Sequence, residues 1–366
     1  MNRLFPLLLF FSLFLLDKVF LIPPVKEKFV KNRLSVYEGL FTFQDKVYKE
    51  HLNHWRDIFG SDQVTVKKQM VFFGSSRSAE FADLKDADFL NNPYWNQVNP
   101  IPPVTSMTVR AGNFTHVYLL YRNFIKNYGT ESVLVLELNS VSFSMGSVFR
   151  DKKETQEIPP NMFRDLFPSL SNKERNEYLS SQFFVLNRLN LNFTGKENQD
   201  VTKVMDSLLI LKKALEKKPE LKNGFQFVGF EEGTENKEQN ASLEKLNEWV
   251  LNSFCRNFKP NKTELRFLED AVKLAKEKKI RLILYRPRVH KMLRETSASL
   301  LKSENEWLQY VTELSRKYEV PFIDLEKNEY MKCRYFVDTS HMSKSCFPEL
   351  IQVLKDKSGY SSEDIR

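Results

Sequence analysis

The chain of 366 residues is poor in several residue types, and each shortage excludes a class of protein. It has three cysteines, Cys255, Cys333 and Cys346, and no CxxC pair. An odd number of cysteines cannot close completely into intrachain disulfides, so the sequence favours neither a disulfide framework nor a structural zinc site. With only 11 glycines, the chain is not collagen-like, and its 42% hydrophobic content is too high for a disordered protein.

Histidine is also scarce, and of the five in the chain only His51 and His54 lie close together. No other ligand cluster accompanies them, so we expect neither a metal ion nor a cofactor. The net charge is +8, from 55 basic and 47 acidic residues. A surplus of this size is compatible with anionic partners but does not indicate nucleic-acid binding, and we expect none.

The N-terminal segment Leu4–Ile22 is apolar apart from Asp17 and Lys18. As a helix it would be about 28 Å long, close to the roughly 30 Å hydrocarbon core of a bilayer. No small-x-small cleavage site follows it. We therefore expect a transmembrane anchor within residues 1–24, with a cleaved signal peptide and a buried helix as the alternatives.

The side of the membrane on which the main domain lies is predicted by the charges that flank this segment. Only Arg3 precedes it, whereas Lys26, Lys28, Lys31 and Arg33 follow it. The positive-inside rule would place the main domain in the cytoplasm. A family resemblance given below predicts the opposite side.

Beyond a connector at 25–66 that includes one helix, short apolar segments alternate with amphipathic helical patterns. The expected strands are 69–74, 104–110, 132–138, 280–285 and 321–325. The alternation predicts an α/β fold, a three-layer α/β/α sandwich with a central, mostly parallel five-stranded sheet. Residues 140–262 interrupt the rhythm, and we expect them to form a helical insertion in a domain at 67–366.

Ligands of doubly wound sheets bind beyond the carboxyl ends of the strands, and several reactive residue types follow the predicted strands. They are Ser75 and Ser76 after the first strand, Gly112 after the second, Asn139 after the third, Arg286, Arg288 and His290 after the fourth, and Asp338 and His341 near the C-terminus.

These residue types fit nucleophilic catalysis by a serine. A neutral hydroxyl needs a base, and the imidazole of His341 needs a carboxylate such as Asp338, three residues earlier. The backbone N–H groups of Ser76 and Gly112 and the amide of Asn139 are suitable donors to an oxyanion. Each feature also has a structural interpretation, as a helix cap, a turn residue or a solvated loop.

The same residues resemble the motifs of the SGNH, or GDSL-like, hydrolase superfamily. Gly74-Ser75-Ser76 matches its Gly-Asp-Ser block with Ser75 in place of Asp, which implies Ser76 as the nucleophile. Asp338 and His341 match its Asp-x-x-His block in full. Glu137-Leu138-Asn139 keeps the Asn of the Gly-x-Asn block but has Glu137 in place of the Gly.

The Gly-Ser-Ser block together with an N-terminal anchor looks most like a membrane-bound branch of that superfamily. The branch includes the D-alanyl transfer protein of teichoic acids and alginate acetylation proteins, and the chain also resembles an uncharacterised spirochaete family. This resemblance implies a flavodoxin-like sheet and an extracytoplasmic domain, on the periplasmic face of the membrane. The basic segment after the anchor would then lie on anionic lipid head groups of the outer leaflet.

The resemblance implies a serine esterase or O-acyltransferase with Ser76, His341 and Asp338 as its triad. The expected substrate is an acylated glycan or lipid of the cell envelope, contacted by Arg286, Arg288 and His290, with a membrane-bound acyltransferase as a possible partner. The alternative is a catalytically inactive envelope protein that binds glycan or a partner acyltransferase. The Glu137 substitution would fit such a loss of activity.

Overall fold

The computed structural model describes residues 5–19, 22, 24–25, 69–108, 113–128, 132–144, 166–183, 220–222, 225–255, 258–300, 302–327 and 329–358. The chain divides into two compact units, Met1–His51 with Asp151–Thr202 and Leu52–Arg150 with Lys203–Arg366. Residues 26–66 of the predicted connector lie outside the described residues, as does Gly112.

The described part of the first unit contains helix α1 (Phe5–Val19), the short 3-10 helix η3 (Phe167–Ser169) and helix α8 (Asn172–Phe183). Most of the large apolar side chains of α1 are exposed. Asp17, by contrast, is buried, and its carboxylate accepts a hydrogen bond from Lys18 at 3.1 Å. None of the described helices has both the length and the hydropathy that a membrane span requires.

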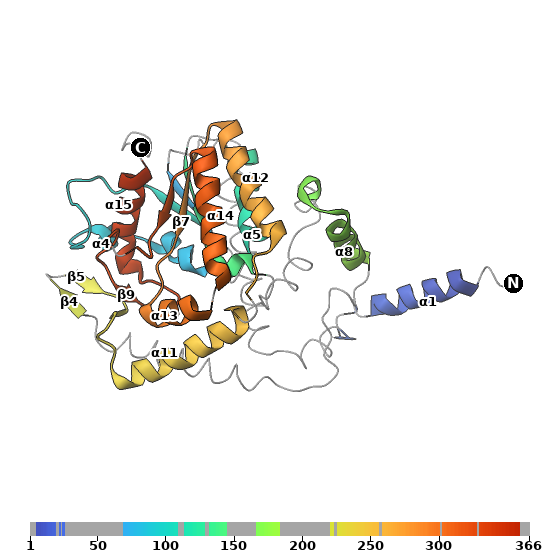
Figure 1. The fold of residues 1–366 in the computed structure, drawn as a ribbon, viewed down its shortest axis with the longest axis horizontal. Helices are drawn as coiled ribbons and strands as arrows, with labels where there is room; N and C mark the ends of the chain where they lie inside the picture. The colour runs from blue at the N-terminus through green and yellow to red at the C-terminus, as the bar shows by residue number, and fades with distance from the viewer. Residues whose placement is uncertain are drawn as a thin grey trace. The chain divides into compact units, whose positions relative to one another are not determined.

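A parallel five-stranded sheet lies at the centre of the second unit (Figure 1). Its strands are β1 (Met70–Gly74), β2 (Val104–Thr108), β3 (Val133–Glu137), β7 (Arg281–Arg286) and β8 (Phe322–Asp324), in the order β2-β1-β3-β7-β8. The five predicted strands are thus confirmed, as is the α/β class. Every residue of β1 and β3 is buried, because helices cover both faces of the sheet.

The major helices are α5 (Phe114–Tyr128), α12 (Lys262–Lys278), α14 (Lys302–Tyr318) and α15 (Phe347–Ser358). Successive residues of a strand point to opposite faces, and Phe72 and Phe73 show which helices lie on each. Phe72 stacks on Phe81, which in turn stacks on Phe347 of α15. Phe73 packs edge-on against Tyr121 of α5. The two faces of the sheet are therefore covered by different helices (Figure 1).

The described part of residues 140–262, for which the sequence predicted a helical insertion, contains strands as well as helices. It includes helix α11 (Lys237–Val250), but also the strands β4 (Glu220–Lys222), β5 (Phe225–Phe227) and β6 (Phe230–Glu231). The alternation Phe-Gln-Phe in β5 buries both phenylalanines, and Phe227 stacks on Tyr335. Strand β6 pairs antiparallel with β9 (Tyr335–Phe336), so this region is attached to the C-terminal segment.

Shorter elements complete the described part of this unit. They are the 3-10 helices η1 (Ser76–Asp83), η2 (Ser140–Phe143) and η5 (Lys344–Cys346), the π-helix η4 (Leu251–Cys255), and the helices α4 (Asp86–Phe89) and α13 (Lys291–Leu300). Helices η1 and η2 begin just beyond the carboxyl ends of β1 and β3, where the candidate site residues lie.

Candidate active site

Ser76 and His341 are 265 residues apart in the chain and in direct contact in the structure. Ser76 is the first residue of η1, directly beyond the carboxyl end of β1. Its Oγ lies 2.7 Å from Nε2 of His341, within hydrogen-bonding distance. The contact places a hydroxyl and a base in the relation that proton transfer from serine requires.

Asp338 holds the opposite side of the imidazole. Its two carboxylate oxygens lie 2.9 and 2.8 Å from Nδ1 of His341. The backbone N–H groups of Ser340 and His341 also donate to Asp338, at 2.7 and 2.9 Å. These contacts fix the carboxylate, which in turn favours the tautomer with a proton on Nδ1 and leaves Nε2 free to accept one from Ser76.

The two charges of this pair stabilise each other. Burial opposes the ionised form of Asp338, but His341 and the two backbone N–H groups lower its pKa to about 2. Burial likewise disfavours the imidazolium, yet the Asp338 carboxylate raises the pKa of His341 above its ordinary value. The site therefore stabilises the imidazolium that forms when His341 takes a proton.

A second buried carboxylate, that of Glu137, lies beneath the turn between β1 and η1. Glu137 Oε2 accepts hydrogen bonds from the Ser75 backbone N–H at 3.1 Å and from the Ser78 hydroxyl at 2.5 Å. Its Oε1 accepts the Ser75 hydroxyl at 2.5 Å. Ser78 also bonds to the hydroxyl of Tyr285. Glu137 thus fixes the residues on both sides of Ser76, so its presence in place of a glycine has a clear structural role.

Asn139 is placed so that its amide can donate to a ligand. Its Oδ1 caps η2 by accepting the Val141 N–H at 3.1 Å. Its amide N–H groups make no hydrogen bond to another described residue, and the side chain lines a cavity. The Ser76 N–H has no acceptor within η1, because it belongs to the first residue of that helix. These are two of the three predicted oxyanion donors; the third, Gly112, lies outside the described residues.

The cavity beside Asn139 has a volume of about 270 Å³. Arg77, the residue after the candidate nucleophile, forms part of its wall, together with Arg286, Arg294 and Glu304. Leu293 and Leu308 are among its apolar lining residues. Neither Ser76 nor His341 lines this space, so it is a compartment beside the Ser76–His341 pair.

The three residues predicted to contact substrate have different environments. Arg286 lines the cavity and forms ion pairs with Glu304 at 2.9 Å and Asp324 at 3.6 Å. Arg288 is fully buried and donates to the Met331 carbonyl oxygen at 3.2 Å.

His290 is also fully buried, and its Nε2 lies 2.7 Å from the Glu235 carboxylate. The structure thus brings Arg286 to the cavity but not Arg288 or His290. The chain after β7 turns inward, so both side chains have partners within the protein.

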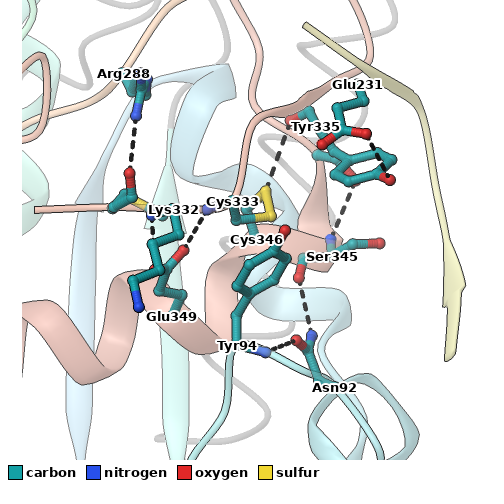
Figure 2. The surroundings of a disulfide bond; sticks show 12 residues. Asn92, Tyr94, Glu231, Arg288, Lys332, Cys333, Tyr335, Ser345, Cys346 and Glu349 are labelled. Carbon is teal, nitrogen blue, oxygen red and sulfur yellow. Dashed lines mark hydrogen bonds between the residues drawn. A yellow bond between two sulfur atoms is a disulfide. The ribbon is translucent and has the colours of Figure 1, made fainter. Parts of the chain in front are cut away.

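A disulfide joins Cys333 and Cys346 (Figure 2). The loop between these two cysteines contains Asp338 and His341. The sequence did not favour a disulfide framework, and this single bond leaves Cys255 as the free cysteine, as the odd number of cysteines requires. Glu349 of α15 accepts the Cys333 backbone N–H at 2.7 Å, which fastens the start of the loop to the last helix. Both ends of the loop 333–346, which contains Asp338 and His341, are therefore fixed to the core.

Sequence reasoning missed Arg77, the positioning role of Glu137 and the disulfide. Arg77 follows Ser76 directly, and an arginine next to a candidate nucleophile is a usable signal. Two cysteines that flank an Asp-x-x-His segment are another. The role of Glu137 depends on the pairing of β1 with β3, and a local sequence pattern does not show which strands pair.

The chain was compared with known proteins and protein families. No curated protein matches it. One family model, described as a protein of unknown function (DUF1574), matches residues 3–357, nearly the whole chain. The chain therefore belongs to the DUF1574 family.

Proposed function

We propose that this protein is a serine-dependent ester hydrolase or O-acyltransferase that acts on acylated glycan or lipid of the cell envelope. The observation that supports the proposal most is the 2.7 Å contact between Ser76 Oγ and His341 Nε2, with Asp338 behind the imidazole. A nucleophile, a base and a group that orients the base are the three parts that acyl transfer by serine requires.

In the proposed reaction, Ser76 Oγ attacks the carbonyl carbon of an ester while its proton passes to His341 Nε2. The Ser76 N–H and the Asn139 amide donate to the oxyanion that forms. The ester C–O bond then breaks, the departing alkoxide takes the proton from His341, and an acyl group stays on Ser76. Water or an acceptor hydroxyl attacks the acyl carbon of this acyl-enzyme and gives its proton to His341. The bond between the acyl carbon and Ser76 Oγ then breaks, and His341 returns the proton to Oγ.

The sheet order supports kinship with the SGNH superfamily. The five strands, numbered along the chain, lie in the order 2-1-3-4-5, which is the flavodoxin-like arrangement. The residues matched to the SGNH blocks lie at the carboxyl end of this sheet. The Glu137 contacts remove the reason for regarding the site as decayed, because the carboxylate fixes the turn at Ser76.

We place the second unit on the extracytoplasmic side of a membrane. The Cys333–Cys346 disulfide supports this side, because disulfides persist in oxidising compartments. The exposed apolar side chains of α1 support membrane attachment. The basic residues that follow α1 argue for the opposite side, and we give the disulfide more weight.

Labelling with a fluorophosphonate probe tests the activity. The probe reacts with activated serines, so the full chain should be labelled and Ser76→Ala should not. Ser75→Ala is the matched control, because it removes the neighbouring hydroxyl and keeps the nucleophile. Labelling that persists in Ser76→Ala, or no labelling of the folded wild-type protein, would overturn the proposal.

A further inference from the structure

Arg77 is a partly buried cation without a counter-ion among the described residues. Its guanidinium makes no hydrogen bond or ion pair with any described residue. Burial lowers the pKa of Arg77, and the carboxylates of Glu137, Glu326 and Asp338 oppose this shift only from a distance. Withdrawing a charge from water costs free energy unless the charge is paired, so an unpaired guanidinium in a cavity wall can gain a partner from an anionic ligand.

The other charges of the cavity wall are already compensated. Arg286 pairs with Glu304, and Arg294 pairs with Glu326 at 3.2 Å. Within the described wall, Arg77 is therefore the cation with no such partner.

The cavity has space for more than a simple ion. Its volume of about 270 Å³ is several times the roughly 30 Å³ that one water molecule occupies. Leu293 and Leu308 offer apolar contacts for a carbon skeleton, whereas Asn139 and Asn305 offer polar ones. A guanidinium binds carboxylates and phosphates through two parallel hydrogen bonds.

We infer that this cavity binds the oxyanionic group, phosphate or carboxylate, of a substrate with a small carbon skeleton, and that Arg77 is its counter-ion. The inference rests on the proposed function and narrows it. One of the two substrates, the acyl donor or the acceptor, carries a negatively charged group close to the ester that reacts. Arg77 and Ser76 are adjacent in the chain, so the anion would orient the substrate relative to the nucleophile.

Ligand-induced thermal stabilisation tests the inference without turnover. The full chain with Ser76→Ala would be titrated with inorganic phosphate, glycerol 3-phosphate and glycerate, against chloride at the same ionic strength. A ligand that binds only the folded state stabilises it by RT ln(1 + L/Kd) at a free ligand concentration L, so the rise in unfolding temperature with ligand concentration gives the affinity. We expect stabilisation by at least one probe, and a loss of at least about tenfold in its affinity when Arg77→Gln is added.

The matched control is Arg316→Gln, which removes the same charge from an exposed position outside the cavity wall and should leave the affinity unchanged. If glycerol 3-phosphate stabilises the protein more strongly, the anionic group of the substrate is a phosphate ester. If glycerate does, it is a carboxylate. The inference is overturned if no probe stabilises the protein, or if Arg77→Gln and Arg316→Gln behave alike. Failure of fluorophosphonate labelling would instead overturn the catalytic proposal, because the titration does not depend on Ser76.

Discussion

The carboxylate of Glu137 occupies the space that a side chain on residue 74 would need. A Cβ on Gly74 would lie 2.5 Å from Glu137 Oε2 and 2.7 Å from Glu137 Cβ. Real Cβ atoms essentially never approach other atoms so closely. The glycine that ends β1 and the glutamate that ends β3 are therefore interdependent, and together they set the turn that presents Ser76.

Gly74→Ala should accordingly destabilise the protein by about 1–3 kcal/mol, the usual cost of overpacking a core. Glu137 must move to admit the methyl group, which breaks its hydrogen bonds to Ser75 and Ser78. Chemical denaturation would measure the stability. The added Cβ would also lie 2.8 Å from Ser78 Oγ, so part of the clash remains without Glu137. The same substitution should still cost less in a Glu137→Gly background, and equal costs in the two backgrounds would contradict this account.

The proposed activity should depend on a histidine, His341, whose pKa is above the ordinary 6.5. His341 accepts a proton only when neutral, so the rate of fluorophosphonate labelling should rise as the pH passes upward through that pKa. Asp338→Asn removes the charge that stabilises the imidazolium and should move the midpoint to lower pH, besides slowing labelling. A midpoint that Asp338→Asn leaves in place would show that the carboxylate does not control His341.

Asn139→Ala should slow ester hydrolysis by roughly a hundredfold or more, the usual loss when one oxyanion donor is removed. The effect should fall on kcat, because the developing oxyanion exists only in the transition state. The substitution also removes the cap of η2, so thermal unfolding is the necessary companion measurement. A lowered unfolding temperature with unchanged kinetics would assign Asn139 a structural role alone.

Replacing both Cys333 and Cys346 with serine should lower the free energy of unfolding by about 3 kcal/mol, because the disulfide closes a short loop. The same loop contains Asp338 and His341, so labelling of Ser76 should also slow. Cys255→Ser, at the free cysteine, controls for the loss of a thiol elsewhere. Equal stability of the double variant and the wild type, under oxidising conditions, would contradict this role.

The sheet could be predicted from the sequence because each central strand is an apolar run, such as Met70–Gly74, buried on both faces. The Ser76–His341 pair could be predicted because both residues lie in motifs that resemble one superfamily. The role of Glu137 could not be predicted, because its partners Ser75 and Ser78 follow a neighbouring strand of the sheet.

Arg288 and His290 were misplaced for a related reason. Position after a strand predicts proximity to the site, but it does not predict the direction in which a side chain points. Their burial depends on packing against β6, β9 and the segment between β8 and β9, which no local pattern specifies.

The most direct test of the triad is the kinetics of His341→Ala on a small activated ester. If His341 is the base for Ser76, kcat/KM should fall by at least about a thousandfold while the protein stays folded. Ester hydrolysis at the wild-type rate in that variant would contradict the account.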